Sequence, residues 1–359
     1  MRYLIDIGHP AHVHYFKNFA WIMLNKGHEV FFTCRNKDVT ISLLEHYNFK
    51  FINLGSNFKS IPGKIFGLFY FTFRILLIAR RYKPDLFLNA TMYSAIVAWL
   101  LNKPHIALED TFNMEQVKLY LPFTNAVLTG DYEHPFLGEK EVRFKGYQEL
   151  LYLHPNYFKP DKTVLKELNI AENESYVILR FVSWNASHDT GHKGMTLENK
   201  IKAVHSFEKY GKVFISSESE LPDELKSYQL KISPHKIHDM IGYASLLFGE
   251  SATMVSEAAV LGIPGIYMDN TGRYYTLEQE ENYGLCYNFS ESLGDQLKAI
   301  ELGISLLFKA DLKKEWGLRR TQMMKDKIDV TELLIWFVES WPESFRIMKE
   351  DKNFQNRFR

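Results

Sequence analysis

The stretch FGESATMVSEAAVLGIPGIYMD, residues 248–269, decides the fold prediction. An apolar run ends at Gly249-Glu250, small polar residues follow, and an apolar segment then leads through Gly262-Ile263-Pro264 into another apolar run. This order predicts a strand, a helix that starts at Ser251 and stops at Gly262, and a second strand. Strand–helix–strand units of this kind build parallel sheets.

The same alternation runs through both halves of the chain. Apolar runs at 2–7, 29–34, 50–54, 84–90, 105–110 and 126–130 alternate with helical patterns at 12–26, 37–47, 62–82 and 93–101. The rhythm restarts with strands at 175–181, 212–217, 245–250 and 264–269. We therefore expect an α/β protein with two Rossmann-like, doubly wound parallel-sheet domains that face a central cleft.

Length and composition fit two domains. The 359 residues exceed one ordinary core. We place an N-terminal domain at 1–150, a second domain at 151–335, and a C-terminal helix and tail at 336–359 that packs back toward the first domain. Residues 351–359 are expected to fray. The stretch from Gly146 to Lys162 is the expected linker.

Charge and cysteine content exclude some classes of protein. Forty-three basic residues balance 43 acidic ones, which argues against a nucleic-acid-binding surface over the whole chain. The cysteines, Cys34 and Cys286, lie in apolar surroundings, and two buried thiols are expected rather than a disulfide. Strand residues follow Met1 directly, so a cytoplasmic protein is expected. The aromatic segment 61–83 ends in basic residues and indicates either contact with the inner face of a membrane or a buried helix.

Ligands of doubly wound domains bind at the carboxyl ends of the strands, so residues there carry the site prediction. After the first strand comes GHPAHVH, residues 8–14. Gly8 allows close approach of a ligand, and a histidine can accept a proton from a substrate hydroxyl near neutral pH. His12 is the favoured base and His9 the second candidate, while a capping role or a metal site are the alternatives. Asp110 is a third candidate, unless it or Thr111 caps a helix at 112–120.

The second half offers residues that can bind a phosphate and a ring. Arg180 and His188 can offset phosphate charge, Trp184 can stack on a ring, and Ser187 lies in the same loop. An ordinary surface loop, or a metal site from His188, Asp189 and His192, are the alternatives. Ser251, Ala252 and Thr253 start a helix whose free N–H groups suit a diphosphate. Glu257 lies one turn later and can accept hydrogen bonds from a ribose.

These motifs also carry a family resemblance. The segment 249–269 resembles the donor site of GT-B glycosyltransferases and of UDP-N-acetylglucosamine 2-epimerases. LIDIGHPAHVHYFKN (4–18), RFVSWNASHDTGH (180–192) and YLHPNYFKPD (152–161) resemble an uncharacterised, glycosyltransferase-like group of domains of unknown function. The resemblance implies that Ser251, Ala252 and Thr253 hold the diphosphate and that Glu257 holds the ribose.

The resulting hypothesis is a GT-B glycosyltransferase that needs no metal and no cofactor. Its donor is a nucleotide sugar such as UDP-GlcNAc, and its acceptor a glycan or a lipid-linked molecule of surface polysaccharide synthesis. The alternatives are an epimerase or hydrolase acting on UDP-N-acetylglucosamine, and a nucleotide-sugar-binding protein without turnover. GHPAHVH replaces the glycine-rich turn frequent in GT-B enzymes, and the Arg-Pro-Glu-type stretch of the epimerases is missing.

Overall fold

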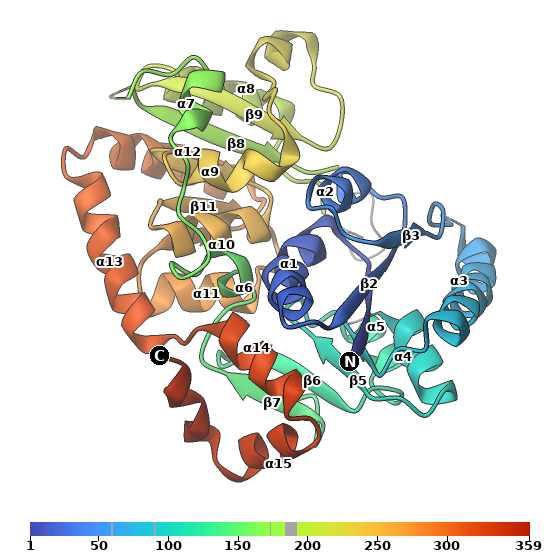
Figure 1. The fold of residues 1–359 in the computed structure, drawn as a ribbon. Helices are drawn as coiled ribbons and strands as arrows, with labels where there is room; N and C mark the ends of the chain where they lie inside the picture. Colours follow the sequence, from blue (N-terminus) through green and yellow to red (C-terminus); the bar gives the residue numbers. More distant parts are fainter. Residues whose placement is uncertain (59, 90, 173, 184–191) are drawn as a thin grey trace. The chain divides into compact units, whose positions relative to one another are not determined.

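The computed structural model describes residues 1–58, 60–89, 91–172, 174–183 and 192–359 (Figure 1). It divides into two compact units. Unit 1 comprises Met1–Tyr157 with Lys327–Arg359, and unit 2 comprises Phe158–Asp326. Each unit has a parallel sheet with helices on its faces, which confirms the α/β prediction with two doubly wound sheets.

Unit 1 is built on a seven-stranded sheet in the order β3-β2-β1-β4-β5-β6-β7. Its strands are β1 (Arg2–Ile7), β2 (Glu29–Cys34), β3 (Phe51–Asn53), β4 (Leu86–Leu88), β5 (His105–Leu108), β6 (Ala126–Gly130) and β7 (Glu141–Phe144). Its α-helices are α1 (Pro10–Asn25), α2 (Thr40–His46), α3 (Ile61–Tyr82), α4 (Met92–Leu100), α5 (Met114–Tyr120), α6 (Leu150–Leu153), α14 (Val330–Glu339) and α15 (Glu343–Glu350), and the 3₁₀-helix η3 (Lys352–Phe358) ends the chain.

The sheet of unit 1 is covered on both faces. Helices α3 and α4 share one core cluster with Leu4 of β1 and Phe87 of β4. Helix α1 packs with α2, α6 and α14. The crossover from β3 to β4 through α3 reverses the strand order beside β1, and the carboxyl ends of β1 and β4 flank this switch point.

Unit 2 has a five-stranded sheet in the order β12-β11-β10-β8-β9. Its strands are β8 (Tyr176–Phe181), β9 (Lys212–Ser217), β10 (Leu246–Gly249), β11 (Gly265–Met268) and β12 (Cys286–Phe289). Its α-helices are α7 (Thr163–Glu167), α8 (Leu197–Phe207), α9 (Ile237–Ile241), α10 (Ala252–Leu261), α11 (Tyr274–Glu281), α12 (Leu293–Phe308) and α13 (Leu312–Asp326), with the 3₁₀-helices η1 (Asp223–Tyr228) and η2 (Pro234–Lys236).

Three details differ from the sequence-based picture. Strands β7 and β12 were not predicted. The expected linker contains α6, whose four residues are all fully buried in unit 1. The expected fraying of 351–359 is wrong, since Gln355 and Phe358 are buried in η3.

Candidate functional site

His9 and His12 both lie at the start of α1, directly after β1. His9 is the N-cap residue, and its Nδ1 accepts a hydrogen bond from the Ala11 N–H at 3.3 Å. A cap satisfies one of the free N–H groups of the first helical turn. The capping role considered from the sequence therefore applies to His9.

His12 is half-buried and held by two donors. Its Nδ1 accepts hydrogen bonds from the side-chain amide of Asn89 at 2.8 Å and from the Gly8 N–H at 3.3 Å. Asn89 makes a second hydrogen bond from the same nitrogen to the Asp6 carbonyl, which fixes the orientation of the amide. Loss of hydration, with the nearby cations Arg35 and Lys37, lowers the pKa of His12 to about 3. The ring is thus neutral near pH 7, with its proton on Nε2.

A buried ion pair lies beneath these histidines. The Asp6 carboxylate is 3.1 Å from the Arg35 guanidinium, and both side chains are almost completely buried. Asp6 also accepts hydrogen bonds from the hydroxyl groups of Thr33 and Thr91. Removing one partner of such a pair leaves an uncompensated charge, so this network fixes the switch point of unit 1. Sequence reasoning missed it, although an aspartate inside the apolar strand 2–7 is the signal.

Asp110 belongs to the same edge of the sheet. Its carboxylate accepts hydrogen bonds from the Tyr15 hydroxyl at 2.7 Å and from the Thr111 hydroxyl at 3.0 Å. The Tyr15 ring lies 5.5 Å from the ring of His12. The alternative that Asp110 or Thr111 caps the following helix is wrong, because Asn113 caps α5.

The neighbouring Glu109 has a different environment. Burial raises the pKa of Glu109 to about 7, although the hydroxyl of Tyr120 and the N–H groups of Phe112 and Thr111 donate hydrogen bonds to it. Phe112 has a positive φ of 53°. Glu109 therefore holds the strained turn that presents Asp110.

In unit 2 the expected diphosphate segment forms the start of α10. Ser251 is the N-cap residue and accepts a hydrogen bond from the Met254 N–H at 3.4 Å, while Ala252 is buried and Thr253 is half-exposed. Gly249 has a φ of 151°, and a Cβ there would lie 2.0 Å from the Arg180 carbonyl oxygen. Only glycine fits at this position, where the chain turns directly from β10 into α10.

Glu257 and Arg180 both have partners within unit 2. The Glu257 carboxylate is buried and lies 2.9 Å from Nε2 of His238 on α9. The guanidinium of Arg180 donates hydrogen bonds to Glu218 at 2.6 Å and to Ser216 at 2.9 Å. A ribose or a phosphate would therefore share these groups with protein partners, and both roles stay predictions.

Glu250 was not predicted as a site residue, and it ties the donor loop to β10. Its buried carboxylate accepts hydrogen bonds from the Val182 N–H at 2.9 Å and the Met195 N–H at 2.7 Å, and lies 3.3 Å from Lys200. Both ends of the loop are thus fixed beside Ser251. The expected site residues Trp184, Ser187 and His188 lie outside the described residues.

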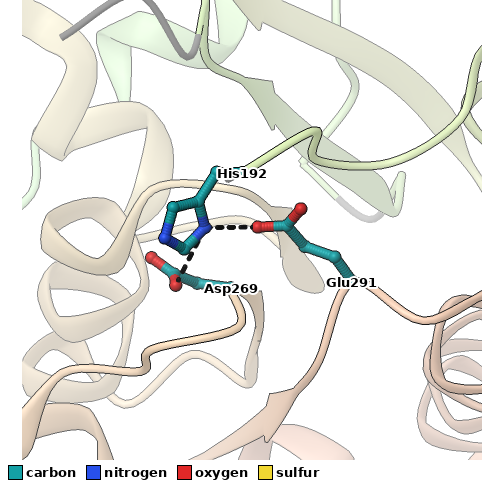
Figure 2. Close-up of side chains that lie close together, drawn as sticks. All are labelled: His192, Asp269 and Glu291. Carbon is teal, nitrogen blue, oxygen red and sulfur yellow. Dashed lines mark hydrogen bonds and ion pairs between the residues drawn. The ribbon is translucent and has the colours of Figure 1, made fainter. Parts of the chain in front are cut away.

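A second cluster lies at the ends of β11 and β12. Figure 2 shows Nδ1 of His192 between two carboxylates, 2.5 Å from Glu291 and 3.5 Å from Asp269. Glu291 also accepts hydrogen bonds from the N–H groups of Lys193 and Gly194. One nitrogen and two oxygen ligands within 4.8 Å of one another suit a divalent cation in their chemistry. The Oδ1 of Asp269 already accepts two hydrogen bonds from Thr271, which weakens it as a ligand.

The cluster can also act without a metal. Desolvation works against the charged carboxylates, but hydrogen bonds from the Tyr267 hydroxyl and Thr271 hold the pKa of Asp269 below its usual range. The N–H groups of Lys193 and Gly194, with His192, do the same for Glu291. Two carboxylates beside one imidazole hold the ring in a fixed orientation. Of the metal site considered from sequence, Asp189 and His188 lie outside the described residues.

The comparisons with known proteins agree with this architecture. A family described as "Protein of unknown function (DUF354)" matches residues 1–275. An uncharacterised protein of Methanocaldococcus jannaschii, MJ0665, is 25% identical over 281 residues, which cover 73% of this chain and 80% of that protein.

Solved structures resemble the whole chain. A Staphylococcus aureus MnaA–UDP co-structure has a TM-score of 0.66 at 12% identity, covering 96% of this chain and 97% of that one. A UDP-GlcNAc 2-epimerase from Neisseria meningitidis bound to UDP-GlcNAc has a TM-score of 0.64 at 13% identity, covering 90% and 99%. The Streptomyces sp. SF2575 glycosyltransferase SsfS6 has a TM-score of 0.61 at 13% identity, covering 95% and 100%. The likeness shows the GT-B fold, which glycosyltransferases and epimerases share.

Proposed function

We propose that this chain, which belongs to the family of proteins of unknown function DUF354, is a GT-B glycosyltransferase. It takes the sugar of a nucleotide diphosphate sugar and transfers it to a glycan or lipid-linked acceptor, as in the synthesis of surface polysaccharides. Unit 2 binds the donor, and unit 1 supplies the groups that act on the acceptor.

The start of α10 carries this proposal. A helix N-terminus with free N–H groups and a partial positive charge attracts a diphosphate, and small side chains let it approach. Ser251, Ala252 and Thr253 provide such a start, and Gly249 brings it close to β10. Two of the solved structures with this fold are complexes with UDP or UDP-GlcNAc.

Acceptor activation is assigned to His12 and Asp110. Because Nδ1 of His12 accepts hydrogen bonds, its Nε2–H can donate one to substrate oxygen. His12, the expected base, can therefore act as a hydrogen-bond donor to the substrate instead. Asp110, at the same edge, is then the stronger candidate to accept the proton of the attacking hydroxyl.

One observation favours an epimerase or hydrolase as the second candidate. Such a reaction works on the donor alone and needs acid–base groups near the sugar. His192 with Glu291 and Asp269 places such groups at the same strand ends as Ser251. A member of this fold class from Neisseria meningitidis is an epimerase of UDP-GlcNAc.

Calorimetry followed by turnover assays tests the proposal. The purified chain is titrated with UDP, UDP-GlcNAc and other nucleotide sugars, and nucleotide release is then measured with and without glycan or lipid-linked acceptors. Acceptor-dependent release of the nucleotide supports a transferase. Epimerised or free sugar without an acceptor favours the second candidate, and donor binding without turnover favours a binding protein. Absence of binding by every nucleotide sugar overturns the proposal.

A further inference from the structure

Helix α3 is apolar on two opposite sides. Gly67, Phe71, Ile75 and Ala79, spaced four residues apart, face the sheet of unit 1, and the last three belong to its core cluster. On the other side, Phe66, Phe69, Phe73 and Leu77 form an exposed apolar stripe, in which the three phenylalanines are 58–69% exposed. A surface helix normally carries polar residues on its outer side.

The neighbouring helix also exposes apolar side chains. Helix α4 packs beside α3 on the same face of the sheet, as Figure 1 shows, and its Trp99 and Leu100 are also exposed. Because the inner sides of both helices meet the same core cluster, their outer sides point away from the sheet together. Exposed apolar side chains gathered on one face of a folded unit mark an interaction site.

The charges around the stripe are of one sign. The 39 residues between Glu45 and Asp85 contain seven lysines and arginines and no acidic residue. Arg80 and Arg81 are exposed in the last turn of α3, and Lys64 is exposed in its first turn. An apolar stripe with basic residues at both ends matches the surface of a bilayer that contains anionic lipids.

We propose that the outer face of α3 and α4 docks on an anionic lipid bilayer. Part of α3, Pro62–Tyr82, is long and apolar enough to cross a membrane. The contacts of its inner side argue for lying on the surface instead, because Phe71 and Ile75 are buried against the sheet and Arg74 donates a hydrogen bond to the Leu54 carbonyl. A second copy of the chain fits this surface less well, since two segments that carry only basic charges would repel each other.

Docking would bring unit 1 to membrane-borne acceptors. This reading of the acceptor as a lipid-linked molecule rests on the proposed glycosyltransferase function. The docking itself does not, because the stripe is separate from the donor-binding residues and needs no substrate. Vesicle binding and nucleotide-sugar binding can therefore fail independently.

Cosedimentation with vesicles tests the inference on the full chain. Phosphatidylcholine vesicles are compared with vesicles that contain phosphatidylglycerol, and the anionic vesicles should bind more protein, less so at high salt. The double variant Phe69→Ser/Phe73→Ser should lower the partition coefficient at least tenfold. Its matched control is Phe308→Ser/Leu318→Ser, which removes two exposed apolar side chains of unit 2 and should bind like the wild type.

The charge contribution is measured separately. Arg80→Gln/Arg81→Gln should weaken binding to anionic vesicles by roughly fivefold for each charge and leave binding to neutral vesicles unchanged. Circular dichroism checks that each variant is folded. Equal binding by the wild type and the Phe69/Phe73 variant overturns the inference. So does a wild-type dimer in light scattering that becomes a monomer in that variant, because the stripe would then bind a second copy.

Discussion

The Nδ1 atom of His12 lies 2.8 Å from the side-chain nitrogen of Asn89, which donates a hydrogen bond to it. With the pKa of His12 lowered to about 3, the neutral ring keeps its proton on Nε2 near pH 7. We expect His12→Ala to lower kcat/KM for transfer by about 10²–10³-fold without changing donor affinity, because a hydrogen bond in the transition state is lost. His12→Gln, which can still donate, should retain part of the activity.

The pH profile separates a donor from a base at this position. If His12 donates through Nε2, the pH dependence of kcat/KM should show the same ionisations between pH 5 and 8 in the wild type and in His12→Gln. An ionisation that disappears in His12→Gln is not expected. Such an ionisation would restore His12 as the base. Full activity of His12→Ala with intact donor binding would remove His12 from the mechanism.

The raised pKa of Glu109 predicts that the free energy of unfolding depends on pH. Its pKa is about 7 in the folded chain and near 4.5 when unfolded, so the folded state binds more protons between these values. Stability from this group therefore falls as pH rises from about 4.5 to 7, by on the order of 3 kcal/mol. Urea denaturation of the wild type and Glu109→Gln at several pH values measures the difference, since glutamine does not titrate. A pH-independent difference contradicts the raised pKa.

Thr253 tests donor binding at the start of α10. It is half-exposed, so Thr253→Val removes a hydroxyl group with little change of shape. We expect the affinity for the nucleotide diphosphate to fall about two- to tenfold, the effect of one hydrogen bond. Thr321→Val, an exposed helical threonine of the same unit, is the control, and calorimetry gives both affinities. Equal affinities would show that the Thr253 hydroxyl does not contact the donor.

Glu291 tests the cluster around His192. We expect Glu291→Gln to lower the free energy of unfolding at pH 7 by about 1–3 kcal/mol, because the charge beside His192 is lost. The pKa of Glu291 is lowered in the folded chain, so its contribution is fully present above the unfolded value near 4.5 and is lost as pH falls from there through the lower folded value. The exposed Glu301→Gln is the control, with a change below about 0.5 kcal/mol. A loss that does not become smaller as pH falls below about 4.5 contradicts the lowered pKa.

Removal of metal ions tests the same cluster independently. Because Asp269 already accepts hydrogen bonds from Thr271, we expect EDTA to leave donor affinity unchanged. Added Zn²⁺ or Mn²⁺ should not raise the thermal midpoint of the chelated protein. A rise that His192→Ala abolishes would instead establish a metal site.

The local features of the candidate site could be predicted, and their partners could not. The strand end at Gly249, the helix start at Ser251 and the helix stop at Gly262 were recognised because such signals depend on neighbouring residues. Glu257 was recognised as an acidic residue on an apolar helix, but its contact with His238 on another helix was not visible. Glu250 was passed over, although it fixes both ends of the loop that the sequence singled out.

The sequence by itself determined the two parallel sheets and the apolar character of residues 61–83, because strand–helix alternation and composition are local properties. Whether that segment is core or surface was decided only by tertiary structure, which buries Phe71 and exposes Phe69 on the same helix. The hydrogen bonding of the His12 ring was likewise decided by a residue 77 positions away. A helix gives every side chain a direction, but only packing on the sheet decides which direction faces water.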